Sequence, residues 1–198
     1  MKGILTKDFI ILFRKMRFII AVTILLSLVP GISVSAFAIL YASMLPVTVL
    51  SFDQQAKWER YAAMLPYDMR DIVLSKYLLG LICAASATLF CLLGVWISAL
   101  ARQTGVDPAQ MCAVLLMFAL ALAVQSLNLP FMFKLGVEKG RMTLIVLAVL
   151  CVPALLAIVN FAGRLPMNML CLTGTALAVA LYAVSAHIAL RIYAASEH

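Results

Sequence analysis

Long apolar runs alternate with short polar connections along the whole chain. The runs cover approximately residues 18–29, 32–50, 78–100, 111–133, 142–161 and 168–192. Most of them approach or exceed the roughly 20 residues with which a helix crosses the hydrocarbon of a bilayer. The charged residues lie in the ends and connections, and none lies deep within a run. The pattern predicts an all-α integral membrane protein with one domain, residues 1–198.

Composition supports this class of protein. Of the 198 residues, 66% are hydrophobic and 12% are charged, and the net charge is +7. A soluble domain of this size needs more charged surface to stay dispersed. Basic loops facing anionic lipid account for the positive charge, so we expect membrane lipid as a partner and no nucleic acid.

The basic residues indicate how the first apolar stretch is divided. The Pro30-Gly31 pair reads as a turn between residues 18–29 and 32–50. With two spans here, thirteen of the fifteen Lys and Arg residues fall on one side, whereas a single fused span divides them almost equally. Because Lys and Arg concentrate in cytoplasmic loops, we predict six transmembrane helices with both termini cytoplasmic. A cleaved signal peptide is disfavoured, since the apolar sequence continues to Leu50.

Residues 1–17 have the pattern of an amphipathic helix. Lys7 and Arg14 lie opposite one narrow apolar stripe, which consists of Leu5, Phe9, Leu12, Phe13 and Met16. This pattern predicts an interfacial helix before the first hairpin, residues 18–50, with Lys7, Phe9, Phe13 and Arg14 as its characteristic residues. The alternative is a basic flank that only orients the protein.

The longest polar segment, residues 51–77, predicts a helical corner between helices 2 and 3. Ser51 and Gln54 form a possible capping box that would start a helix. Trp58, Tyr61 and Leu65 follow the spacing of one apolar helix face.

Pro66 would end that helix, and Asp71 favours the start of the next one. The next helix would run from Met69 into the third span and project beyond the hydrocarbon. An interfacial loop with an aromatic anchor is the alternative. The last four spans, residues 78–198, would complete the domain.

Four stretches of the chain resemble one family. They are residues 57–78, with Leu65-Pro66-Tyr67-Asp68-Met69-Arg70-Asp71 at their centre, the opening residues 1–9, the connection 129–141 and the last helix, residues 185–193. Together they resemble the ABC-2 type transporter permeases of bacteria, in the branch with a short chain and a separately encoded ATPase. The short first hairpin and Met69 depart from that pattern.

The resemblance implies the permease subunit of an ATP-binding cassette exporter in the bacterial cell membrane. Its partners would be an ABC ATPase subunit, which binds ATP and Mg, and a second permease copy or a similar permease. Coupling to the ATPase would involve Trp58, Tyr61, Leu65, Pro66, Arg70 and Asp71. The cargo would be an amphipathic or antimicrobial peptide or a similar amphiphile. The alternative is a non-transporting membrane scaffold or immunity protein with the same fold.

The residues themselves also indicate that the energy for transport comes from another subunit. The sequence has no Gly-x-x-x-x-Gly-Lys-[Ser/Thr] loop for ATP. We also expect no buried carboxylate or Lys that could couple transport to protons or sodium. The chain is therefore predicted not to be an enzyme and to bind no cofactor or metal itself, and its five cysteines are interpreted as packing residues.

Uncharged polar residues in the fourth and fifth spans have two interpretations. Gln125, Ser126 and Asn128 precede Pro130, and Asn160 lies late in the fifth span. Such groups commonly join helices by hydrogen bonds. Alternatively, Pro130 opens its helix and these groups line a substrate path.

Overall fold

The computed structural model describes residues 2–29, 31–58, 61, 64, 69–103, 105, 108–162 and 167–195. It describes the backbone alone over residues 137–162 and at residues 2, 32, 33, 69, 135, 167, 168, 170 and 193–195. The described residues are mostly helical and contain no strand, which confirms the all-α fold class. The helices are α1 (Lys2–Lys15), α2 (Arg17–Leu28), α3 (Ile32–Ser43), α4 (Leu45–Gln55), α6 (Met69–Ala101), α7 (Pro108–Ala162) and α8 (Met167–Ala195).

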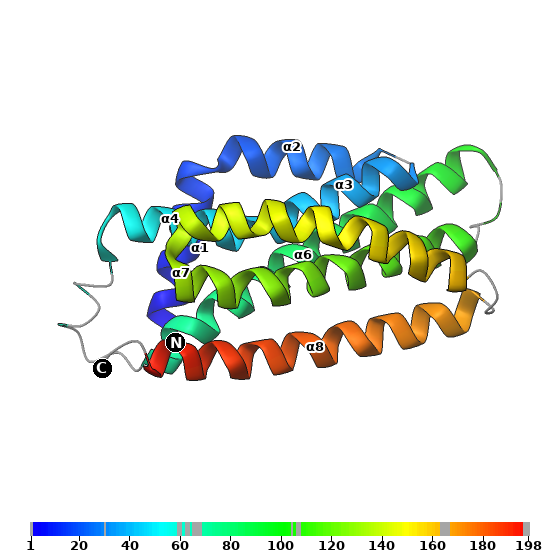
Figure 1. Ribbon diagram of the computed structural model, residues 1–198. Helices are drawn as coiled ribbons and strands as arrows, with labels where there is room; N and C mark the ends of the chain where they lie inside the picture. The colour runs from blue at the N-terminus through cyan, green and yellow to red at the C-terminus, as the bar shows by residue number, and fades with distance from the viewer. Residues whose placement is uncertain are drawn as a thin grey trace.

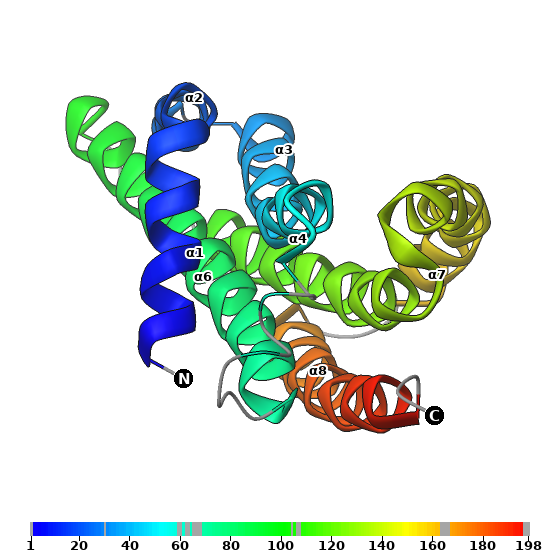
Figure 2. The same cartoon turned by 90° about the vertical axis from the view of Figure 1, so that its left-hand side faces the viewer.

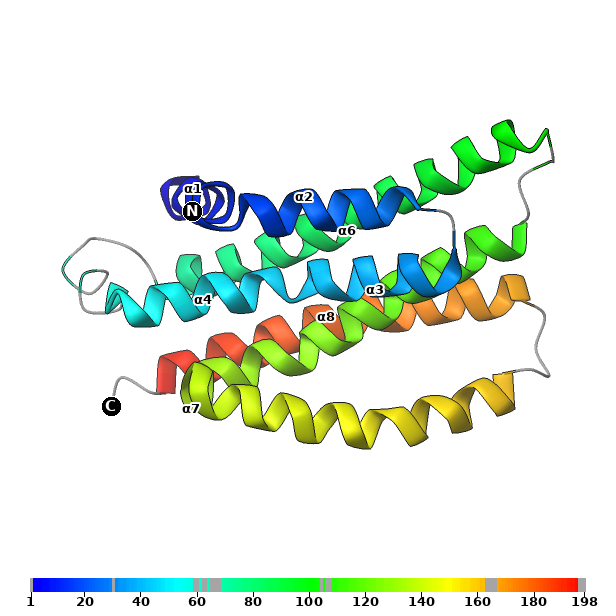
Figure 3. The ribbon, with the colours of Figure 1, turned by 90° about the horizontal axis from the view of Figure 1, so that it is seen from above.

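The helices after α1 run back and forth along one common axis (Figure 1). The end of α4, the start of α6 and the end of α8 lie together with α1 at the left in Figure 1, which we call the α1 end. Figure 3 shows α1 almost end-on while α2 runs lengthwise. In Figure 2, which looks at the α1 end, α1 lies across the ends of α2 and α6. Thus α1 crosses the direction of the bundle, and its location in a membrane interface stays a prediction.

A break divides the second apolar run into α3 and α4. Pro46 lies in the first turn of α4, where its missing N–H interrupts the hydrogen bonding of a continuous helix. The predicted helix start at Ser51 is wrong, because α4 runs through Ser51 to Gln55. Inside a helix the backbone N–H groups already have partners, so the capping pattern has nothing to cap.

A turn at Gly136 divides α7 into two limbs. Gly136 has φ 77° and ψ 167°, the only non-helical backbone angles within α7. Only glycine adopts such a conformation at little steric cost. The alternative in which Pro130 opens its helix does not hold, since α7 continues through that residue.

Four helical segments among the described residues are long and apolar enough to cross a membrane. They are Val34–Gln55, Arg70–Ala101, Pro108–Lys134 and Cys171–Ile192. Helix α2 is apolar but has only 12 residues, and the second limb of α7 lies outside the side chains described. The predicted count of six transmembrane helices therefore stays a prediction.

Small residues bring the helices together in the middle of the bundle. Ala38 and Ala42 of α3 pack with Ala87 and Cys91 of α6 and with Ala121 of α7. Short side chains allow the close helix approach on which packing in a membrane depends.

At Gly94 the backbone of α6 closely approaches the backbone at the end of α2. A Cβ atom at Gly94 would lie 2.9 Å from the backbone oxygen of Leu28 and 3.0 Å from that of Ser27. Since backbone atoms cannot rotate away, we expect Gly94→Val to destabilise the protein by about 1–3 kcal/mol. Thermal unfolding of the purified protein measures this loss. Gly105→Val is the control, because nothing lies within 4 Å of a Cβ atom there; equal stability of the two variants would contradict this packing.

Candidate functional site

The described part of the predicted coupling segment lies at the α1 end. Tyr61 and Arg70 are exposed there, and Asp71 is half-buried and has an interaction partner. Trp58 instead faces the protein and packs against Ile4 of α1 and Ile72 of α6. Leu65 and Pro66, and with them the predicted corner, lie outside the described residues.

Four charged side chains from three helices meet beside Trp58, and we call them the ion quartet. Lys7 and Asp8 come from α1, Asp53 from α4 and Lys76 from α6. The Lys76 Nζ atom lies 2.7 Å from Asp8 Oδ1 and 2.5 Å from Asp53 Oδ2. The Lys7 Nζ atom lies 2.8 Å from Asp53 Oδ1, 3.3 Å from Asp8 Oδ1 and 4.1 Å from the centre of the Trp58 ring.

Three of the four side chains are buried, and the quartet is electrically balanced. Asp8 is 0% exposed, Lys76 1% and Asp53 6%. A buried charge is tolerated only when it is paired and hydrogen-bonded. Two carboxylates and two amines pair in this way, although Asp8 Oδ2 has no hydrogen-bond partner among the described residues. These contacts hold α1 against the end of α4 and the start of α6.

The chain therefore does bury carboxylates and a Lys, contrary to expectation. That none of them couples transport to protons or sodium stays a prediction. The overlooked signal lies in α1, where Asp8 stands between Leu5 and Leu12 on the apolar stripe. A carboxylate on the buried face of a helix requires a cation from another segment. Lys76, at the polar start of the third apolar run, provides it.

The remaining residues of the predicted interfacial helix divide between two faces. Lys7 differs from its expected position opposite the apolar stripe, because it turns toward Asp53 in the quartet. Arg14 and Phe13 are exposed, whereas Phe9 is half-buried. The Phe9 and Phe13 rings stack with their centres 6.3 Å apart.

The uncharged polar residues of α7 lie inside the bundle. Gln125, Ser126 and Asn128 are all buried. The Asn128 Nδ2 atom lies 3.6 Å from Met44 Sδ, at the break between α3 and α4. The Gln125 amide has no hydrogen-bond partner among the described residues and occupies the space left by the absent side chain of Gly80. The side chain of Asn160 lies outside the described residues.

A second polar contact joins α6, α7 and α8. The Tyr77 hydroxyl lies 2.8 Å from the Ser185 hydroxyl, which donates to the backbone oxygen of Ser126. Ser185 therefore accepts from Tyr77. The Tyr182 hydroxyl donates to the backbone oxygen of Tyr77 at 2.7 Å. The sequence alone could not pair these residues, because more than 100 positions separate Tyr77 from its two partners on α8.

The described residues contain no group of three or more His, Cys, Asp or Glu side chains arranged to hold a metal ion. Comparison with curated proteins gives no match, and comparison with solved structures gives none either. The family model described as ABC-2 family transporter protein matches residues 3–194, almost the whole chain. With its several apolar helices, the chain is a multi-pass membrane protein and belongs to the ABC-2 family of transporter proteins.

Proposed function

We propose that this chain is the transmembrane permease subunit of an ABC exporter and that it works with a separately encoded ATPase. The observation that carries this proposal is the family match over residues 3–194. ABC-2 permeases are the membrane components of their transporters and generally work with an ABC ATPase. Because the sequence has no phosphate-binding loop, ATP and Mg would be bound by that partner.

The ATPase would bind at the α1 end, which would face the cytoplasm of a bacterial cell. Tyr61 and Arg70 are exposed at this end and could contact a partner. Trp58 would support this surface without contacting the ATPase itself, since it packs against α1 and α6. A displacement of the start of α6 by the ATPase would also move α1 and α4, because the ion quartet joins the three helices. As semi-rigid helices, they would extend this movement into the membrane.

The bundle would be completed by lipid and by a second permease, either another copy or a similar chain. Only 17% of the apolar window of α8 is buried within the chain. Large apolar side chains such as Leu172 and Leu177 are exposed on that helix, at 73% and 66%. Exposed apolar surface of this extent requires hydrocarbon or a partner helix to cover it.

The cargo would be an amphipathic peptide or a similar amphiphile, moved along a path between the two permeases. Gln125, Ser126, Asn128 and Asn160 are the candidates for contacts with it. Gln125 supports the idea most directly, because its buried amide has no partner among the described residues. A small shift of the helices could present that amide to a passing polar group.

Co-purification tests the proposal. We expect the tagged chain, expressed with the ATPase encoded beside its gene, to retain that ATPase through purification. The reconstituted complex should hydrolyse ATP, and the isolated chain should not. A chain that binds no ATPase, or whose complex moves no amphiphile into vesicles, would instead be a scaffold or immunity protein.

The orientation has its own expected result. In a background without cysteines, Gly105→Cys should react with an impermeant thiol reagent added to intact cells. Gln55→Cys should react only after the membrane is permeabilised, because the basic α1 end should remain in the cytoplasm. Mass-tag labelling measured on gels distinguishes the two. Labelling of Gln55→Cys in intact cells would overturn the proposed orientation.

A further inference from the structure

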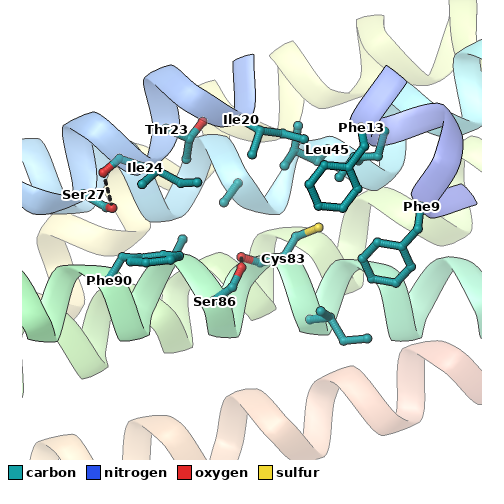
Figure 4. A pocket seen from close by; sticks show the side chains of 14 residues that line it. Phe9, Phe13, Ile20, Thr23, Ile24, Ser27, Leu45, Cys83, Ser86 and Phe90 are labelled. Carbon is teal, nitrogen blue, oxygen red and sulfur yellow. Dashed lines mark hydrogen bonds between the residues drawn. The ribbon is translucent and has the colours of Figure 1, made fainter. Parts of the chain in front are cut away.

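An apolar groove with a volume of about 320 Å³ lies among α1, α2 and α6, with α3 and α4 contributing to its wall (Figure 4). Phe9 and Phe13 lie at one end of the groove, and Ser27 and Phe90 lie at the other. The groove starts where α1 crosses the bundle and continues along α2 and α6.

The three hydroxyl groups in the wall of this groove all donate to backbone carbonyls. Its hydroxyls belong to Thr23, Ser27 and Ser86, and each donates to a carbonyl of its own helix. The distances are 2.8 Å from Thr23 to Ile19, 2.7 Å from Ser27 to Ile24 and 2.9 Å from Ser86 to Cys83. The groove therefore suits a hydrocarbon chain better than a peptide, whose backbone would require polar partners.

The length of the groove fits one leaflet of a bilayer. Its lining on α6 extends from Ile82 to Phe90. Eight helical steps between them span about 12 Å. One leaflet contributes about 15 Å of hydrocarbon. A lipid whose headgroup lies near α1 could thus place most of one acyl chain along the groove.

Positive charge stands at the α1 end of the groove. Arg17 begins α2 and occupies the helix stripe that continues through Ile20 and Ile24, two residues that line the groove. Arg14 and Arg17 are exposed, and neither pairs with a carboxylate of the described residues. Lys15 makes a cation–π contact instead, with its Nζ atom 4.7 Å from the centre of the Phe52 ring. Two unpaired guanidinium groups favour an anionic headgroup over a zwitterionic one.

From this geometry we propose that the groove is a binding site for an anionic glycerophospholipid, with one acyl chain in the groove and the headgroup beside Arg14 and Arg17. The ion quartet holds α1 in place, so one wall of the site is already formed before the lipid arrives. The leaflet assigned to this lipid rests on the proposed orientation, whereas binding itself does not.

Binding can be tested on the purified chain without its ATPase. We expect the parent protein to retain phospholipid through detergent washing, as measured by mass spectrometry. Phosphatidylglycerol should raise its unfolding temperature more than phosphatidylcholine with identical acyl chains. A parent protein that retains no phospholipid, or that responds equally to the two lipids, would overturn the proposal.

Substitutions at Ser86 and Arg17 distinguish the contribution of the acyl chain to binding from that of the headgroup. Ser86→Trp fills the groove and should abolish lipid retention; Ser86→Leu, which fills it less, serves if the larger residue prevents folding. Leu89→Trp is the matched control, since Leu89 is exposed on the same helix and does not line the groove. Arg17→Gln should retain lipid but bind phosphatidylglycerol about fivefold more weakly, the effect of one basic residue near a membrane surface.

Arg102→Gln removes one positive charge at the other end of the bundle and should leave lipid selectivity unchanged. If both Ser86 variants retained as much lipid as the Leu89→Trp variant, no acyl chain would occupy the groove. If they altered dimer formation and left lipid content unchanged, the groove would be a contact between permease copies and the proposal would be wrong.

Discussion

Lys76→Met should destabilise the folded protein by roughly 3–5 kcal/mol, the range observed when one partner of a buried ion pair is removed. Asp8 and Asp53 would lose their contacts at 2.7 and 2.5 Å and would share the single amine of Lys7. The methionine side chain preserves much of the packing but compensates neither carboxylate. Unfolding in mixed detergent micelles measures the difference in free energy.

Two further variants determine whether charge causes this loss. Combining Lys76→Met with Asp8→Asn and Asp53→Asn removes the unpaired carboxylates, so most of the stability should return. Lys7 then lacks its anions, but its side chain is 22% exposed and can reach water. Lys15→Met, on the exposed side of α1, should change stability little. A triple variant less stable than Lys76→Met would contradict the ionic explanation.

Arg70→Glu should weaken assembly with the ATPase at least about tenfold, because like charges placed in an interface cost several kcal/mol. Transport should fall with assembly. The chain itself should fold normally, since Arg70 is exposed in the first turn of α6 and a negative charge near a helix N-terminus is favourable. Co-purification and transport into vesicles measure the effect.

Arg102→Glu is the matched charge reversal, on an exposed residue just after the other end of α6. It should leave assembly and transport near the parental level. If Arg70→Glu assembled and transported like the parent, Arg70 would not contact the ATPase, and the assignment of this surface would be wrong.

Long-range hydrophobic patterning predicted much of the helical architecture. The run at residues 78–100, extended back to Met69, became α6 (Met69–Ala101), and the run at 168–192 became α8 (Met167–Ala195). Such helices are predictable because their length and apolar content leave few other ways to satisfy a backbone in hydrocarbon. Single proline and glycine residues predicted the interruptions of helices less well. Pro130 does not open α7, whereas the chain reverses at Gly136, where the left-handed backbone requires glycine.

The contacts between helices could not be predicted from periodicity. Of the apolar stripe predicted for α1, Leu12 and Met16 are buried and Phe13 is exposed. The role of Asp8 depends on Asp53 and Lys76, which lie 45 and 68 residues away from it. Gln125 is similar, since its position depends on the missing side chain of Gly80 on another helix. Spacing along one helix identifies which face is buried and carries no information on which helix covers it.

The ion quartet also sets an order for biosynthesis. Asp8 leaves the ribosome 68 residues ahead of Lys76. At a synthesis rate of about 5–20 residues per second, that interval lasts roughly 3–14 s. During it, Asp8 and, for the last 23 residues, Asp53 have only Lys7, of the four, to neutralise them and must remain near water. The ion quartet that holds α1 against the bundle therefore cannot be complete until the start of α6 has emerged.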